Sequence, residues 1–348
     1  MLGEATSTSP REPLIFERCT SQNALDTFFS WPLQEQWNPS TKGNETREVF
    51  LKADPNGFIC GKIINPETRR EEIISIVSAI TYGNDQAWVG FYIVNPRFRG
   101  HGYGLESFRK ALEHAGHDRA SVGLDGVMAQ VENYKKSGFT AVAWQNGRRH
   151  GSIRDLIENQ ERDLADRIAR DEVPGLVLLT DPKVDKKELA VIEQRYAGLK
   201  RPQFVQDWAD FHALHPEEHR FGVAVLATDD NNGLENAEKP AKGTMLGWAC
   251  VRPAETSYRV GPLYADTPEV AKQLLVKLAY EVLQAEKQSP YHVPLKFDVD
   301  VPNSNQAAVE LFDRIGWNDT FPSLRMWKGK MPEHDVNGVF GVASLEVG

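Results

Sequence analysis

Glycines and arginines cluster in the segment VNPRFRGHGYG at residues 94–104. A bound pyrophosphate needs several backbone N–H groups pointing at one place, and glycines permit that approach because they lack a Cβ atom. Arg97 and Arg99 can add charge-assisted hydrogen bonds to phosphate oxygens. The spacing differs from the Rossmann and P-loop nucleotide motifs, since no Gly-Lys-Ser/Thr follows. The segment predicts a phosphate-binding loop of another kind, with a plain helix-entry turn as the alternative.

Two aspartates close to predicted strands are candidates for a general base. Asp125 follows a short predicted strand in GLDG (123–126), and Asp85 lies in the turn before another strand. A carboxylate can remove a proton from a nucleophile directly or through a water molecule. The Asp-Gly pair is also a common turn sequence, so a structural role is the alternative. We take Asp125 as the candidate base.

The elements around these residues are readable from their patterns. A short helix is predicted at 24–29, and segments 57–64, 72–82 and 87–94 predict three consecutive antiparallel strands, because short turns connect them. Leu105, Phe108 and Leu112 have helical spacing and predict a helix over 105–115 that directly follows the glycine loop. A strand at 121–124, a helix at 127–137 and a strand at 140–144 follow. The charged residues 148–171 predict a linker helix that closes a first domain near residue 150.

A similar order of elements recurs in the second half. Strands are predicted at 176–180, 221–227, 245–251, 257–264, 295–299 and 324–327, and helices at 186–196, 203–214, 269–285 and 306–315. Residues 88–94 can be laid over 258–264, and NYKKSGF (133–139) over LFDRIGW (311–317). The chain of 348 residues therefore predicts a duplicated α/β (α+β) fold, with domains at 11–150 and 173–348 and a linker at 151–172.

These motifs resemble the GCN5-related N-acetyltransferase (GNAT) superfamily, whose signature Arg/Gln-x-x-Gly-x-Gly/Ala follows its fourth strand. Arg99, Gly102 and Gly104 fill the three defined positions. The resemblance implies two tandem GNAT-type domains, each with a mixed, mostly antiparallel sheet flanked by helices. It implies acetyl-CoA as co-substrate, held by the backbone of the fourth strand and by the loop. The implied binding residues are Tyr92, Ile93, Val94, Arg99, Gly100, His101, Gly102, Tyr103, Gly104 and Leu105.

The resemblance also implies a catalytic role for Tyr134. A tyrosine four residues before a Gly-Phe pair is often the general acid of the superfamily, and a phenol can protonate a departing thiolate within hydrogen-bond reach. Core packing is the alternative role for this side chain. The asparagine commonly found seven residues earlier is Val127 here. The expected reaction is direct attack of an amine on the thioester, with a backbone N–H of the fourth strand holding the oxyanion.

The second half departs further from the family pattern. The segment YADTPE (264–269) stands at the place of the glycine loop and contains no glycine, and Phe312 stands where Tyr134 stands. Asn305 occupies the asparagine position that the first half lacks. This half resembles the degenerate acetyltransferase domain, of the acetyltransferase domain 18 type, that follows an active one in tandem proteins. We expect it to shape the acceptor site or to stabilise the first domain.

Composition limits the partners. The net charge of −9 disfavours nucleic acid and membrane partners and mildly favours a cationic amine acceptor, either a small molecule or an amine of a protein. Trp31, Trp37 and Asn38 could line the amine site or pack in the core. An acyl-CoA sensor or an interaction protein without turnover is the alternative to an enzyme. The oligomeric state stays open.

A few residue types bear on the cellular compartment of the protein and on metal binding. The three cysteines are widely separated, so the sequence predicts neither a disulfide framework nor a zinc site and fits a reducing compartment. The N-terminus lacks a secretory pattern and no segment has the roughly 20 apolar residues of a membrane span, which predicts a soluble, cytoplasmic protein. His212, His215 and His219 are close in sequence, but Pro216 interrupts them. No metal is expected.

Overall fold

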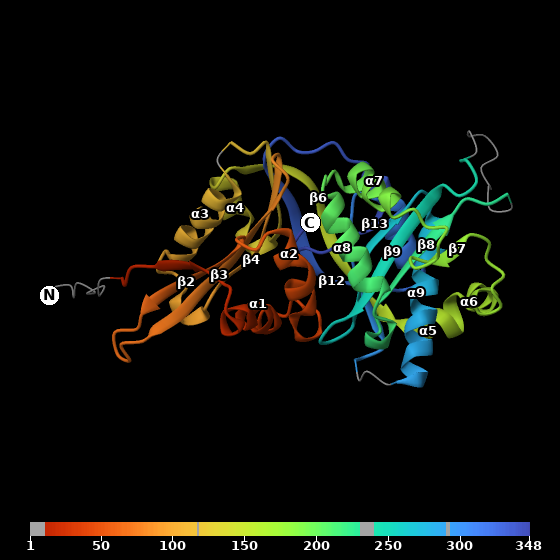
Figure 1. Cartoon of the computed structure of the whole chain (residues 1–348), viewed down its shortest axis with the longest axis horizontal. Coiled ribbons are helices and arrows are strands. Elements are labelled where there is room, and N and C mark those ends of the chain that lie inside the picture. The colour runs from red at the N-terminus through yellow and green to blue at the C-terminus, as the bar shows by residue number, and fades with distance from the viewer. Residues whose placement is uncertain (1–10, 117, 230–239, 290–292) are drawn as a thin grey trace, which may run out of the picture.

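A computed structural model describes residues 11–116, 118–229, 240–289 and 293–348, and Figure 1 shows two lobes that share one sheet. The strands are hydrogen-bonded in the order β1-β2-β3-β4-β5-β12-β6-β11-β10-β9-β8-β7, and β13 pairs with β10. Their bounds are β1 Ile15–Arg18, β2 Phe58–Ile64, β3 Glu71–Tyr82, β4 Gln86–Val94, β5 Ser121–Val127, β6 Phe139–Ser152, β7 Leu176–Leu178, β8 Phe221–Leu226, β9 Met245–Pro253, β10 Tyr258–Ala265, β11 Lys296–Pro302, β12 Asn318–Gly329 and β13 Val339–Gly341.

Helices flank this sheet in both lobes. In the first half these are α1 (Gln22–Gln34), a π-helix (Thr46–Phe50) continued by α2 (Leu51–Ala53), α3 (Tyr103–Ala115) and α4 (Val131–Lys136). In the second half they are α7 (Lys186–Ala197), α8 (Pro202–Ala213), α9 (Pro268–Gln288) and α10 (Gln306–Arg314). Between these two groups in the sequence come α5 (Ile153–Asp155), a π-helix (Leu156–Gln160) and α6 (Arg162–Ala169), which pack against α9 in the second lobe. The expected mixed, mostly antiparallel sheet with flanking helices is confirmed.

The two halves repeat one arrangement. In the first, β2, β3 and β4 are antiparallel, and β4 then pairs in parallel with β5 over only three residues, with Trp88 opposite Gly123 at the last pair. In the second, β10 pairs in parallel with β11 over three residues, from Tyr258 to Val260. In each half a helix, α3 or α9, connects the two parallel strands. Beyond these short ladders the paired strands diverge, which leaves an opening in each half of the sheet.

The halves exchange strands, which the sequence patterns do not predict. Strand β12 of the second half lies between β5 and β6 of the first, antiparallel to both, and β6 in turn pairs with β11. Figure 1 shows β12 and β6 crossing the middle of the molecule. Residue 150 lies inside β6, so the sheet continues through the place where the first domain was expected to close.

The C-terminal segment runs from one opening to the other. β13 pairs with β10 at Leu263 and Tyr264, beyond the point where β10 leaves β11. The chain then reaches the first half, where the indole N–H of Trp88 donates to the carbonyl of Leu345 (3.1 Å). Residues 339–348 are all buried. This segment therefore borders both places where parallel strands diverge.

The structure corrects the expectation on cysteines. Cys19 and Cys60 form a disulfide with their Cα atoms 5.9 Å apart, while Cys250 is free and buried. The pairing of β1 with β2 brings the two cysteines together, although they are 41 residues apart. Because β1 has only four residues and was not predicted, cysteine spacing could not reveal the bond. The disulfide also removes the support that cysteine spacing gave to a reducing compartment.

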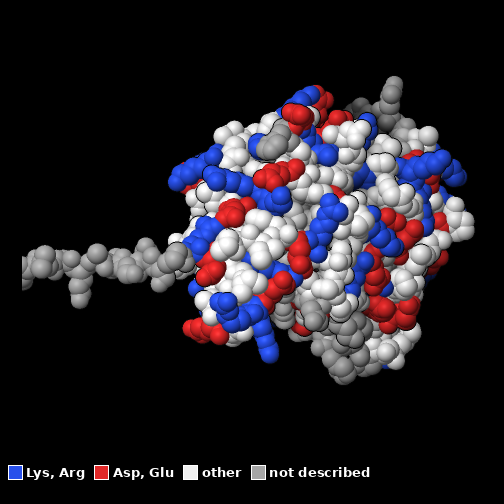
Figure 2. All heavy atoms as spheres, turned by 60° about the vertical axis from the view of Figure 1, so that its left-hand side comes forward, with Lys and Arg blue, Asp and Glu red and all other residues white. Residues whose placement is uncertain are grey.

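The surface carries charges of both signs. In Figure 2, where the first half of the molecule is turned toward the viewer, Lys and Arg side chains are interspersed with Asp and Glu side chains. Among the described residues, the helices are too short or too polar to cross a membrane.

Candidate active site

A cavity of about 510 Å³ lies where β4 diverges from β5. One end of it is bordered by the glycine loop, including Arg99, Gly100 and Gly104. The other end is bordered by the C-terminal segment, since a Cβ atom built on Gly90 of β4 would lie 2.1 Å from the carbonyl oxygen of Glu346. A volume of this size suits a small-molecule site.

The glycine loop has the geometry that a phosphate-binding loop needs. Gly100 and Gly102 have φ angles of +83° and +81°, which favour glycine, and α3 begins directly after Gly102. Within the described part of the chain, no hydrogen bond engages the backbone N–H groups of residues 100–105. These donors lie at the positive end of a 13-residue helix. The residues present therefore fit a pyrophosphate.

The side chains of the predicted loop residues differ in their surroundings. Arg99 donates to the carbonyl of Val94 (2.9 Å) and forms an ion pair with Glu35. The ring of Tyr103 is buried and its hydroxyl donates to the carbonyl of Glu12 (3.1 Å). His101 and Leu105 are exposed. Backbone atoms of this loop, more than side chains, are free to meet a ligand.

Strand β4 carries a bulge inside the cavity. The register with β3 shifts so that Phe91 and Tyr92 together face Val77, and Phe91 has a φ angle of +48°. A non-glycine residue in this conformation is strained, and such residues cluster at functional sites. A bulge frees a strand N–H from the ladder, which an oxyanion site requires. The predicted residues Ile93 and Val94 follow it and also line the cavity.

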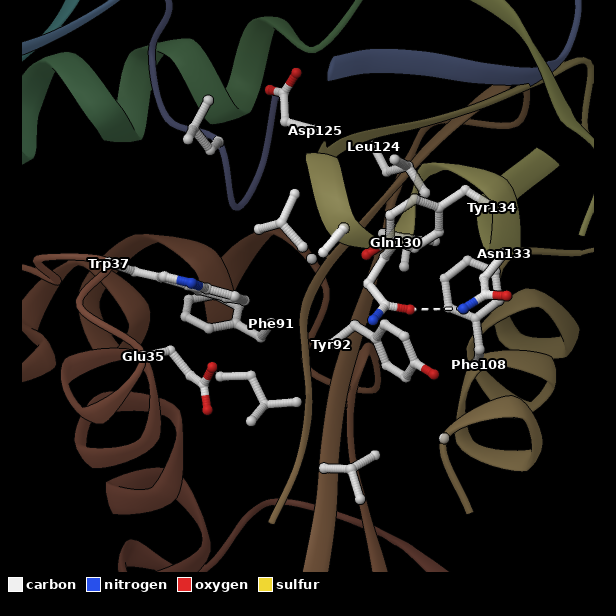
Figure 3. Close-up of a pocket in the computed structure, with 18 of the residues that line it drawn as sticks. Glu35, Trp37, Phe91, Tyr92, Phe108, Leu124, Asp125, Gln130, Asn133 and Tyr134 are labelled. Carbon is white, nitrogen blue, oxygen red and sulfur yellow. Dashed lines mark hydrogen bonds between the residues drawn. The ribbon is translucent and has the colours of Figure 1, made fainter. Parts of the chain in front are cut away.

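Tyr134 lies on the cavity wall, as Figure 3 shows. Its ring packs against Phe108 and Tyr92, with centroids 5.7 and 6.4 Å apart, and the absence of a side chain on Gly126 makes room for it. No hydrogen bond between its hydroxyl and another described residue is present. Burial raises the pKa of Tyr134, so the phenol keeps its proton at neutral pH. The side chain is both packed and able to donate a proton.

Asp125 also borders the cavity, but its carboxylate is engaged. Arg325 of β12 donates to both of its oxygens (3.0 and 2.6 Å), and Asn146 of β6 donates to one (3.1 Å). Burial raises the pKa of Asp125, against the opposing charge of Arg325. Asp85, the other candidate, lies in a different groove of the surface. The strand exchange thus places a cationic partner beside the predicted base.

Several cavity residues were not singled out from the sequence. Trp37 was weighed for the amine site and does line the cavity, whereas Asn38 is buried in hydrogen bonds to Ser257 and Asp298 (2.8 Å each). Further lining residues come from the C-cap of α1, from β6, from β12 and from the C-terminal segment, and only long-range pairing brings them here. They are Glu35, Arg148, Phe321, Leu345 and Glu346.

The corresponding opening of the second half is filled by protein. β13 occupies it, and a Cβ atom on Gly341 would lie 2.7 Å from the side chain of Val299. Asn305 donates to the carbonyls of Asn337 and Val339 (2.9 and 3.0 Å), so it holds this segment in place. Phe312 is fully buried. Where the first half has a cavity, the second half has a packed strand.

The three histidines do not converge. His212 is buried with Nδ1 2.7 Å from the carbonyl of Trp208, and His219 Nδ1 lies 2.9 Å from the hydroxyl of Tyr258. His215 is half-buried beside Glu217 (3.1 Å).

Comparisons with known proteins agree with the duplicated fold. The model of the acetyltransferase (GNAT) family matches residues 20–139, and the model of an acetyltransferase (GNAT) domain matches residues 231–341. The holothin acyltransferase of Pseudoalteromonas sp. (strain SANK 73390) is 28% identical over 318 residues, which cover 91% of this chain and 89% of that protein.

Two solved structures share the fold over most of the chain. A Pyrococcus horikoshii protein described as a candidate acetyltransferase superposes with a TM-score of 0.67 at 18% identity, covering 99% of both chains. A tandem GNAT protein from the clavulanic acid biosynthesis pathway superposes with a TM-score of 0.53 at 15% identity, covering 92% of this chain and all of that one. With one GNAT domain matched in each half, the chain belongs to the GNAT acyltransferases as a tandem protein.

Proposed function

We propose that the protein transfers an acetyl or other acyl group from acyl-CoA to the primary amine of a small molecule. The observation that carries this proposal is the cavity at the β4–β5 divergence, which has free loop N–H groups at one end and an unengaged tyrosine hydroxyl on its wall. The amine would attack the thioester directly while both substrates are bound. Family membership supports acyl transfer, and the acyl-CoA and the acceptor are part of the proposal.

The proposed mechanism assigns one task to each group of residues. Acyl-CoA supplies the thioester carbonyl, whose carbon forms the new bond to nitrogen as the bond to sulfur breaks. The loop N–H groups of residues 100–105 would bind the pyrophosphate, and an N–H at the β4 bulge would hold the oxyanion. Tyr134 would give its proton to the departing thiolate. The proton that the amine loses would leave through water or through Asp125.

A small-molecule acceptor follows from the shape of the site. Trp37, Phe321 and Leu345 line the cavity together with the glycine loop. A cavity of about 510 Å³ fits a compact ligand better than an extended peptide.

The direct test is acetylation of amines by the purified chain. Incubation with acetyl-CoA and a panel of amines should release CoA thiol and give a product heavier by one acetyl group, detected by mass spectrometry. Acetyl-CoA binding without thiol release on any amine would favour the alternative, a non-catalytic acyl-CoA sensor. If acetyl-CoA does not bind, an interaction protein without turnover is the better account.

Asp125 is proposed as the proton acceptor, and its pair with Arg325 demands a double-variant test. Asp125→Asn alone should cost about 3–5 kcal/mol of stability, because it leaves the buried guanidinium unpaired. Asp125→Asn combined with Arg325→Gln should recover part of that stability in denaturant unfolding. If turnover stays low in the stable double variant, Asp125 acts as the base; if turnover recovers with stability, its role is structural.

A further inference from the structure

Each charged side chain that lines the cavity already has an oppositely charged partner. Arg325 holds both oxygens of Asp125, and Arg148 holds both oxygens of Asp300 (2.8 and 3.1 Å). Glu346 is paired with Arg259 (3.2 Å) and accepts from Ser344. At the loop end, Glu35 is paired with Arg99. Among the described residues that line the cavity, each carboxylate therefore has an arginine partner.

This pairing matters for the charge of the acceptor. An alkylamine with a pKa like that of lysine, about 10.4, arrives as a cation at neutral pH. Such a cation needs a free carboxylate, since burial of an unpaired charge is strongly unfavourable. The cavity offers ion-paired carboxylates only, and the remaining titratable groups that face it, Tyr92 and Tyr134, are kept neutral because burial raises the pKa of each phenol.

Aromatic and aliphatic side chains form part of the cavity lining. They include Trp37, Phe91 and Phe321, together with Leu345. Figure 3 shows the Trp37 and Phe91 side chains next to each other on the wall opposite Tyr134. Aromatic faces can hold a cation, but the guanidinium of Arg148 already lies over the Phe321 ring, 5.1 Å from its centroid. An approaching cation would meet this positive charge.

We propose, on the basis of the proposed function, that the acceptor is a weakly basic amine on a flat aromatic or heteroaromatic frame, uncharged at neutral pH. An amine of this class presents its nitrogen lone pair without prior deprotonation. It therefore reacts in a site whose carboxylates are tied to arginines. Its ring stacks on Trp37 and Phe91, where burial of aromatic surface supplies binding energy. This assignment replaces the mild preference for a cationic amine that the net charge suggested.

The test compares two amines that carry the same ring but differ in basicity. With the full chain and acetyl-CoA at pH 7, kcat/KM for aniline should exceed that for benzylamine at least tenfold. The value for aniline should stay flat from pH 6.5 to 9, while that for benzylamine should rise about tenfold per pH unit as its free base accumulates. A benzylamine value that is flat with pH and equals or exceeds the aniline value overturns the inference.

A pair of tryptophan variants tests the aromatic wall. Trp37→Leu should raise KM for aniline at least fivefold and leave the affinity for acetyl-CoA unchanged. Trp31→Leu is the matched control, because Trp31 of the preceding helix α1 also packs against the core but does not line the cavity. Equal effects of both variants on KM would contradict the proposed stacking. CoA release only with amines that are cationic at pH 7 would contradict this inference and leave the proposed function standing. Failure of the chain to bind acetyl-CoA would contradict the proposed function itself.

Discussion

Tyr134 combines two properties that a proton donor in a closed site needs. Its ring is held by Phe108, Tyr92 and the bare backbone at Gly126, so its position is fixed by packing. Its hydroxyl remains free toward the cavity. Core packing and catalysis were alternatives in the sequence, and the structure shows that packing does not exclude a catalytic role.

Replacement of Tyr134 by Phe removes the hydroxyl and keeps the ring. If the proposal holds, kcat falls by roughly a hundredfold or more, while the dissociation constant for acetyl-CoA is unchanged. Because burial raises the pKa of Tyr134, the phenol should keep its proton as the pH rises from 7 to 10. Ionisation of Tyr134 should therefore cause no fall in wild-type activity over this range.

Tyr92→Phe serves as the control, since Tyr92 presents the other phenol of the cavity. Its kcat should change little. A collapse of kcat in Tyr92→Phe with normal turnover in Tyr134→Phe would assign the proton to Tyr92 instead.

At the scale of elements, local patterns predicted most helices and strands, and long-range pairing decided the rest. Strand β6 was expected at 140–144 but continues to Ser152. Its extension, QNGRRHGS, has no strand-like alternation, and it is a strand because it pairs with β11 and buries Arg148 against Asp300. β1 and β13 have only four and three residues, too few for a readable pattern. The glycine loop and Tyr134 were readable because their signals are local.

The exchanged strand β12 gives an element-scale prediction. A fragment of residues 1–172 lacks β12, which leaves β5 and β6 unpaired at that edge and Asp125 without Arg325. We expect this fragment to be unfolded or aggregated by circular dichroism and size-exclusion chromatography. Co-expression with residues 173–348 should give a complex that copurifies and binds acetyl-CoA. A monomeric 1–172 fragment with the thermal stability of the full chain would contradict this role for β12.

Across the whole molecule, duplication has produced one open site and one filled site. The segment after β12 closes the opening of the second half as β13 and then lines the cavity in the first half. An ion pair also joins the two halves, since Arg148 of β6 holds Asp300 of β11, which is held within its own half by Arg259 of β10. The second half therefore supplies part of the cavity wall, in keeping with the expectation that it shapes the acceptor site.

The central claim is a single acyl-CoA site per chain, in the first half. Titration calorimetry of the full chain with acetyl-CoA counts the binding sites directly. The same titration is made with Gly102→Val, which forces a β-branched residue into a φ of +81° beside the free loop N–H groups. Gly116→Val, at the other end of α3 with a φ of +93°, is the control for backbone strain. We expect one site per chain, lost in Gly102→Val and retained in Gly116→Val. Two equivalent sites, or normal binding by Gly102→Val, would contradict it.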